Sequence, residues 1–218
     1  MEKHQSRRLL AAALFFIAAS TIYLSTEAIS AHAWVDPDYG YTYHYISDLG
    51  VAKRLMIDGR AVYSPLAYVM NSGFILYGLL SMSAYLLAAP LLQQKARVLV
   101  SLVAVIQGVG NVLVGLFPGE TYDYTNMHTI GAGMAIAAGN LTLILFGIYL
   151  NKHHSSTKKR LRKLAIGLGI FGLIALGMLL MNDFGYPAVF ERLSVYTMTL
   201  WNYVFGIWLI RAMQRKYL

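Results

Sequence analysis

Six long apolar stretches constrain this chain more than any other feature of its sequence. A helix needs roughly 20 mostly apolar residues to span the hydrocarbon core of a bilayer. Backbone polar groups find no partners in lipid, so such a segment must be helical, and none of the six alternates like an outer-membrane barrel strand. We therefore expect a single all-α domain over residues 1–218, an antiparallel bundle of six transmembrane helices. The spans are 9–30, 63–90, 98–117, 127–150, 164–182 and 194–211.

The composition supports an integral membrane protein. The chain is 57% hydrophobic and only 13% charged, and a soluble domain usually carries about twice that charged fraction. It has no cysteine, which excludes a disulfide framework and cysteine-ligated zinc. Many of its glycines fall inside the spans, where small residues let helices approach each other closely.

The basic residues are distributed unevenly between the two sides of the predicted bundle. The side with both termini and the loops 91–97 and 151–163 holds 14 of the 18 basic residues and one acid, Glu2. The other side holds four basic residues and nine acids, so the two sides carry +13 and −5. Short cytoplasmic loops are enriched in Lys and Arg. We therefore expect a multi-pass protein of the cell membrane with cytoplasmic termini, membrane lipids as partners and no nucleic acid.

The first apolar stretch has a second interpretation. Residues 1–33 resemble a signal peptide, with Ala31-His32-Ala33 as a small-residue cleavage site. The apolar stretch is longer than a usual signal core, which favours an uncleaved first span.

The outer side has one long loop, 31–62, and two shorter ones, 118–126 and 182–193. Its tyrosines and tryptophan suit the headgroup region, where a ring is half buried and its polar tip stays hydrated. Because the first loop is long, we expect a short helix or an ordered cap there. Asp58-Gly59 predicts a turn that leads into the second span.

Three histidines fall on the outer side near carboxylates. Histidine and carboxylate together can bind a divalent metal or act as general acid and base. No ligand spacing such as H-x-x-x-H occurs in the sequence. No cofactor is therefore predicted, and a divalent metal site stays open. The residues concerned are His32, His44 and His128, with Asp36, Asp38, Asp48 and Asp123.

His128 has the most informative surroundings. It begins the fourth span, and residues 131, 132, 135 and 139 on its helix face are all Gly or Ala. Small residues indicate a close neighbour, so the imidazole is expected to point into the bundle. It is either part of a site or hydrogen-bonded to a carbonyl at the interface.

Amide side chains lie inside several spans. Polar groups in hydrocarbon are costly without partners, so these amides should face each other or a hydrated cavity. They either hold helices together or line a pocket in the outer half. The amides are Asn71, Gln107, Asn111, Asn140 and Asn202.

Arg192 is the one basic residue of the last outer loop, and Glu27 is the one acid inside the first span. A Glu27–Arg192 pair and an Asp48–Arg192 pair are both open. Arg192 is equally suited to hold a phosphate or carboxylate headgroup.

Three motifs carry a resemblance to known families. They are Tyr45-Ile46-Ser47-Asp48-Leu49-Gly50 with Ser64-Pro65 and Asn71; Gly115-Leu116-Phe117-Pro118 with His128-Thr129-Ile130-Gly131-Ala132; and Glu191-Arg192-Leu193 with Tyr196 and Trp201. The whole chain resembles a prokaryotic six-helix membrane family catalogued only as a domain of unknown function. More distantly, it resembles the damage-regulated autophagy modulators and the membrane proteins that remodel GPI-anchor lipids. The resemblance implies six helices and a functional outer face with Ser47, Asp48, Asn71, His128 and Arg192, but no reaction.

Membrane hydrolases of the alkaline ceramidase type offer another comparison, since Ser47, Asp48, His44 and His128 supply their residue types. That family normally has seven spans and a paired histidine motif near its C-terminus. This chain has no histidine after His154, which argues against the comparison.

The sequence favours two functions over the others. The first is binding of a lipid or amphiphile in an outward-facing polar pocket, with Ser47, Asn71, Asn111, Arg192 and Trp201 as binding residues. The second is an enzyme that modifies a lipid headgroup, with Asp48 and His128 as catalytic residues. A small-solute transporter ranks below both, because no acid lies at mid-membrane. The oligomeric state is left open.

Overall fold

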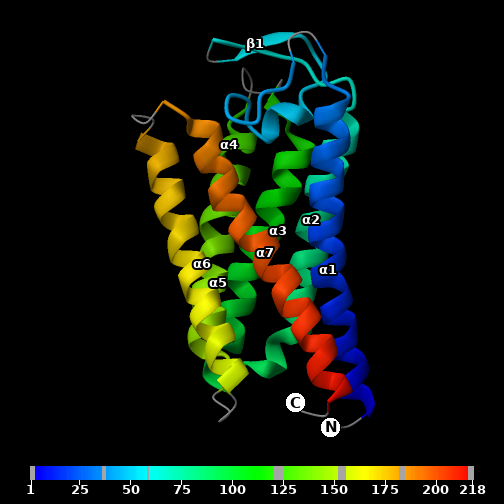
Figure 1. The fold of residues 1–218 in the computed structure, drawn as a ribbon, viewed down its shortest axis with the longest axis vertical. Coiled ribbons are helices and arrows are strands. Elements are labelled where there is room, and N and C mark those ends of the chain that lie inside the picture. Colours follow the sequence, from blue (N-terminus) through cyan, green and yellow to red (C-terminus); the bar gives the residue numbers. More distant parts are fainter. Residues whose placement is uncertain are drawn as a thin grey trace.

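The computed structural model describes residues 3–35, 38–57, 59–119, 125–151, 156–181 and 185–215. Six of its helices are long and apolar enough to cross a membrane. This confirms the all-α polytopic bundle expected from the apolar stretches. The helices stand along one common axis, and both chain termini lie at the same end of the bundle (Figure 1). We call this the terminal end, and the opposite end the capped end.

The helix boundaries extend beyond the apolar stretches in several places. α6 begins in the basic run that precedes its apolar stretch, because Lys and Arg are good helix formers. α7 begins at Pro187, a residue type favoured in the first helical turn. The helices are α1 (Lys3–His32), α2 (Ala67–Ala88), α3 (Arg97–Leu116), α4 (Met127–Gly133), α5 (Gly139–Tyr149), α6 (Ser156–Met181) and α7 (Pro187–Gln214).

The fourth span is made of three consecutive pieces. α4 and α5 are joined by the π-helical segment Met134–Ala138, labelled η5, without a break in the helix. Short 3-10 turns, η2 (Ala89–Leu91) and η3 (Gln94–Ala96), connect α2 to α3 at the terminal end.

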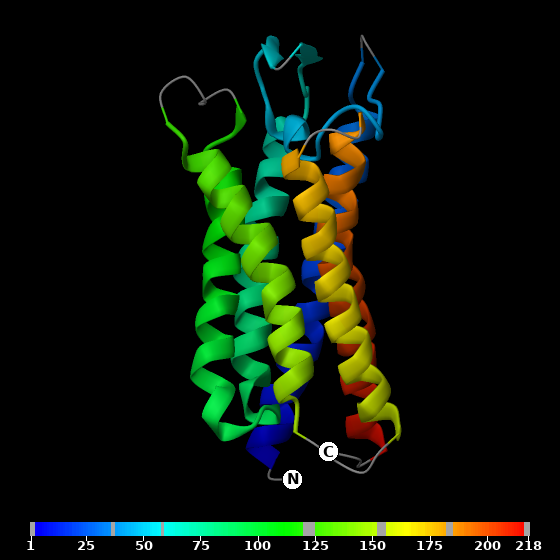
Figure 2. The ribbon, with the colours of Figure 1, turned by 90° about the vertical axis from the view of Figure 1, so that its left-hand side faces the viewer.

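The six spans form a closed ring. Each span packs against its neighbours in sequence, and α1 also packs against α7. The antiparallel arrangement is visible from the side in Figure 2. Aromatic side chains fill the interior where α1, α5 and α7 meet: the ring of Phe205 lies 5.5 Å from that of Phe16 and 5.0 Å from that of Phe146.

Glycines allow the closest helix contacts, as the sequence indicated. A Cβ atom on Gly110 would lie 2.4 Å from the backbone nitrogen of Ala135, and one on Gly169 would lie 2.5 Å from the carbonyl oxygen of Asn140. Backbone atoms cannot move aside easily, so these positions exclude any side chain. Gly167, by contrast, faces open space.

Asn140 on α5 belongs to a hydrogen-bond network that joins α5, α6 and α7. Its Nδ2 donates to the carbonyl oxygen of Ser194 on α7 at 3.0 Å, and its Oδ1 accepts from Thr197 at 2.7 Å. Ser194 in turn donates to the carbonyl oxygen of Gly172 on α6 at 2.8 Å. This intramembrane amide therefore holds helices together.

A folded cap, residues 33–66, covers the capped end between α1 and α2. It contains the 3-10 turn η1 (Ser47–Gly50) and a two-stranded antiparallel hairpin of β1 (Leu55–Ile57) and β2 (Arg60–Val62). This confirms the ordered cap expected from the length of the loop. Gly59, with φ of 77°, lies in the hairpin turn, while Asp58 lies outside the described residues. The turn thus closes a hairpin, and α2 begins only at Ala67, after Pro65.

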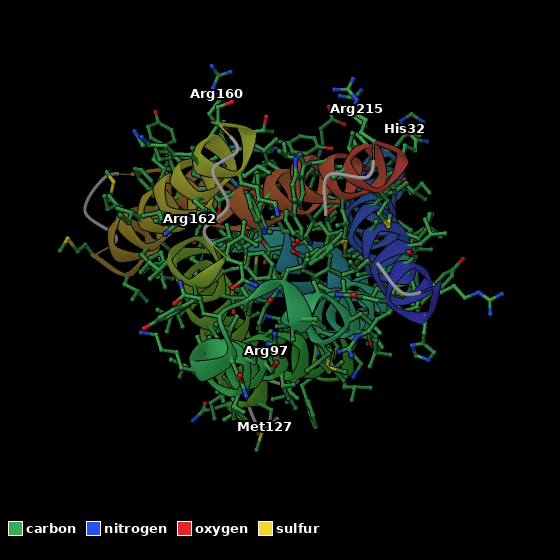
Figure 3. All side chains as sticks on the ribbon, turned by 90° about the horizontal axis from the view of Figure 1, so that it is seen from below. His32, Arg97, Met127, Arg160, Arg162 and Arg215 are labelled. Atoms are coloured by element: carbon green, nitrogen blue, oxygen red, sulfur yellow. The ribbon has the colours of Figure 1, made fainter. Side chains whose placement is uncertain are left out.

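Arginines at the terminal end bind carbonyl groups of neighbouring helix ends. Arg8 on α1 donates to the carbonyl oxygen of Leu86 at 2.9 Å, and Arg162 on α6 donates to that of Gly147 at 2.9 Å. The last carbonyls of a helix lack intrahelical donors and carry partial negative charge. Figure 3 shows Arg162 within the outline of the bundle, whereas Arg160 points away from it.

Candidate functional site

The side chains of Glu27 and Arg192 form an ion pair inside the capped end of the bundle. Arg192 Nε lies 3.5 Å from Glu27 Oε1, and the two residues are only 6% and 1% exposed. Tyr196 donates its hydroxyl to the same Glu27 oxygen at 2.8 Å. Of the pairings that the sequence left open, the structure forms Glu27–Arg192.

The two Nη atoms of Arg192 donate hydrogen bonds to the cap and to its own helix, α7. Its Nη1 donates to the carbonyl oxygens of His44 at 2.7 Å and Ala188 at 3.2 Å, and its Nη2 donates to the hydroxyl of Tyr39. The guanidinium also lies 5.1 Å from the ring centre of Tyr41. A headgroup bound by Arg192 would have to displace these contacts.

Two further buried carboxylates fix the backbone at the start of the 45–50 motif. Asp48 accepts from the backbone N–H of Tyr45 at 2.9 Å and from Arg60 Nε at 3.3 Å. Glu191 on α7 accepts from the backbone N–H of Ile46 at 2.6 Å. A carboxylate that accepts such bonds is well satisfied in a buried site. Asp48 therefore holds the cap together internally, and Glu191 anchors it to α7.

Asn71 anchors the other end of the motif. Its Nδ2 donates to the carbonyl oxygen of Gly50 at 2.9 Å, and a Cβ on Gly50 would lie 2.3 Å from Asn71 Oδ1. Ser47, half-buried, begins the η1 turn. The motif that resembles a family signature is therefore the joint between the cap, α2 and α7.

His128 and Asn111 make local bonds to neighbouring carbonyls. His128 is buried, as its small-residue face predicted, and its Nδ1 lies 2.7 Å from the carbonyl oxygen of Phe117. Asn111 donates to the carbonyl oxygen of Gln107, one turn earlier in α3, at 3.0 Å. The structure forms the carbonyl bond considered for His128, and its role in a site stays a prediction.

Trp201 lies deeper in the bundle than the other predicted binding residues. It follows Arg192 by nine residues, a rise of about 14 Å along a helix. Its side chain is fully buried, and its ring stacks on that of Phe205 at 5.1 Å. The structure thus gathers Ser47, Asp48, Asn71 and Arg192 around the cap, and places Trp201 in the aromatic core.

A cleft opens between the last turns of α1 and the cap. We call it the α1 cleft; its volume is about 450 Å³. Trp34 and Tyr41 flank Tyr39, with ring centres 5.2 Å and 5.0 Å away, respectively. The cleft is adjacent to the ion pair, because the hydroxyl of Tyr39 accepts the hydrogen bond from Arg192. It is lined by Ala28, Ala31, His32, Trp34, Asp38, Tyr39 and Tyr41.

The sequence analysis singled out several of the residues that line the cleft, but it assigned them other roles. The tyrosines and Trp34 were expected at the interface, and His32 and Asp38 belonged to the histidine and carboxylate group. What sequence reasoning missed was their arrangement around one space. The available signal was the density of aromatic residues between 34 and 45.

Burial shifts the acid–base behaviour of the cap. It raises the pKa of the Tyr39 and Tyr41 phenols, and in both cases Arg192 opposes the shift. Both phenols therefore keep their protons at neutral pH. Burial lowers the pKa of His44, with Asp48 acting in the opposite direction.

The structure brings no metal-binding cluster together within the residues that it describes. No group of three His, Cys, Asp or Glu side chains in those ranges is placed to hold an ion. Asp36 and Asp123, two of the carboxylates considered with the histidines, lie outside the described residues.

Six spanning helices in a closed ring, with a polar cap at one end, define a multi-pass membrane protein. The chain belongs to the family described as "Protein of unknown function (DUF998)", whose model matches residues 9–208. This confirms the expected membership of a membrane family with no assigned reaction. No curated protein and no solved structure matches the chain. The resemblance to the autophagy modulators stays a prediction.

Proposed function

We propose that this protein binds a lipid or another amphiphile in the α1 cleft. The proposal places it in the cell membrane with both termini cytoplasmic, so that the cleft faces outward. The observation that carries the proposal is a space of about 450 Å³, lined by aromatic and polar side chains, where the first span ends. Ligand sites are typically concave and about 300–1,000 Å³ in volume.

The position of the cleft suits an amphiphile. A headgroup would contact Trp34, Tyr39 and Tyr41 at the level where aromatic residues meet the membrane interface. Its chain would lie along the outer surface of α1, where Ile29 is 50% exposed. In this function Ser47, Asp48, Asn71 and Arg192 act indirectly, because they hold the cap that forms one wall of the cleft.

The test is to fill the cleft with a larger side chain. Ala28 lines the cleft and is exposed, so Ala28→Trp should occupy it. Ser25→Trp, one turn earlier on the same exposed surface of α1, is the matched control. The readouts are native mass spectrometry of lipid retained through purification and the thermal shift produced by added lipid.

We expect the wild-type protein and Ser25→Trp to retain lipid, and Ala28→Trp to lose it. Equal retention by all three proteins would mean that bound lipid sits elsewhere on the bundle. Absence of both retained lipid and a thermal shift in the wild type would overturn the proposed function.

A further inference from the structure

We infer that the α1 cleft selects an ammonium group, so that its ligand is an amphiphile with an amine or quaternary-amine head. This inference rests on the proposed function and names its ligand class. The ammonium group is the shared chemistry of ethanolamine and choline headgroups and of free alkylamines.

The aromatic rings give the first reason. A cation is attracted to the negative face of an aromatic ring, and cages of such rings are a common way to bind quaternary ammonium. Trp34, Tyr39 and Tyr41 line the cleft together. The Arg192 guanidinium lies 5.6 Å from the Tyr39 ring centre and 5.1 Å from that of Tyr41, and Tyr39 also stacks on His44. An incoming ammonium group would therefore chiefly meet the free side of Tyr41, which is 48% exposed.

The charge of the lining gives the second reason. Among the residues that the structure describes, Asp38 is the carboxylate that lines the cleft, and no Lys or Arg lines it. Arg192 lies next to the cleft, but Glu27 balances its charge and its Nη atoms donate to protein oxygens. An anionic head would therefore meet the Asp38 carboxylate, and of the described lining only the His32 imidazole could pair with it.

The experiment compares amphiphiles that share one tail. Protein in nanodiscs is titrated with dodecyltrimethylammonium, dodecyl sulfate and dodecyl maltoside below their micelle concentrations, and tryptophan fluorescence reports binding. Lysophosphatidylethanolamine and dodecylamine form a second pair, which separates a phospholipid source of the ammonium group from a free amine. Choline without a tail measures the contribution of the head alone.

We expect the ammonium probe to bind best, and Asp38→Asn to weaken it roughly fivefold, the scale of an exposed charge pair. Tyr41→Leu should weaken it as well. Tyr43→Leu is the control, because Tyr43 is exposed in the cap and does not line the cleft.

The outcomes separate the two proposals. Equal binding of all three head types would overturn the ammonium inference and leave the proposed function standing. Tighter binding of the sulfate would likewise overturn it. If no amphiphile binds, both proposals fail. An Asp38→Asn protein that keeps full ammonium preference would also contradict the inference, provided that its melting temperature equals that of the wild type.

Discussion

Arg192 Nε lies 3.5 Å from Glu27 Oε1, so one buried ion pair joins the last helix of the bundle to the first. The other nitrogens of the same guanidinium reach the cap through His44 and Tyr39. One side chain therefore links α1, α7 and the cap. Any change that breaks the pair should loosen all three at once.

Arg192→Met is expected to destabilise the protein by about 3–5 kcal/mol, the usual cost of removing one partner from a buried pair. The loss arises because Glu27, only 1% exposed, is left in a buried site without its counter-ion. Chemical denaturation in detergent micelles measures the free energy of unfolding. Arg192→Met combined with Glu27→Gln should recover part of the loss, since the double change removes both charges.

Arg54→Met supplies the control for that comparison. Arg54 is also an arginine of the capped end, but its side chain is exposed and lies over the ring of Tyr63 at 4.7 Å. Surface substitutions usually change stability by less than about 0.5 kcal/mol. A loss at Arg54 as large as that at Arg192 would contradict the role assigned to the buried pair.

Gly169→Ala and Gly167→Ala should have opposite effects although they lie two residues apart in α6. The methyl group at position 169 would meet the Asn140 carbonyl oxygen at 2.5 Å and force α5 and α6 apart. At position 167 nothing lies within 4 Å, and Ala favours a helix over Gly by about 1 kcal/mol. Thermal unfolding should show a lower melting temperature for Gly169→Ala only; equal effects would argue against this contact.

Stability should fall as the pH drops below the ordinary histidine pKa of 6.5, in part because of His44. Burial lowers the pKa of His44 in the folded protein, so the unfolded chain takes up its proton first as pH falls. The stabilisation is complete above pH 6.5 and is lost as pH falls through the lowered value. Melting temperatures between pH 7.5 and 5 test this.

His44→Gln should flatten that pH dependence, and His4→Gln, an exposed residue near the start of α1, should leave it unchanged. Buried carboxylates contribute equally to the pH dependence of the wild type and both variants. The difference between the melting curves therefore reports the His44 imidazole alone. Parallel curves for the wild type and His44→Gln would show that the cap does not sense the protonation of His44.

Cysteine labelling tests the orientation of the bundle. The chain has no cysteine, so single substitutions need no background removal. Tyr43→Cys in the exposed cap should react with an impermeant maleimide on intact cells, whereas Arg215→Cys should react only after permeabilisation. The reverse pattern would contradict cytoplasmic termini.

The fold was largely predictable because the bilayer constrains it so strongly. A segment of about 20 apolar residues has few alternatives to a spanning helix, and six such segments give the observed bundle. The hairpin between Leu55 and Val62 was not predicted, since strands this short carry little periodic signal. Nor was the π-helical segment Met134–Ala138, because its composition is that of an ordinary apolar helix.

The sequence singled out the residues that hold the cap, but it predicted neither their partners nor the residues that line the α1 cleft. Asp48, Asn71 and Arg192 were singled out, and the Glu27–Arg192 pair was one of the possibilities considered. Sequence alone could not choose between Glu27 and Asp48 as the partner of Arg192, because Arg60 also competes for Asp48. In the structure Arg60 pairs with Asp48 at 3.3 Å. The α1 cleft depends in the same way on contacts between α1 and the cap.

The closed ring has a consequence for biosynthesis. Because α1 packs against α7, α1 gains this neighbour only after the spans between Glu27 and Arg192 have been synthesised. Until then Glu27 lies in the membrane without its counter-ion. Insertion of α7, rather than of each earlier segment in turn, is therefore the step that closes the core of the bundle.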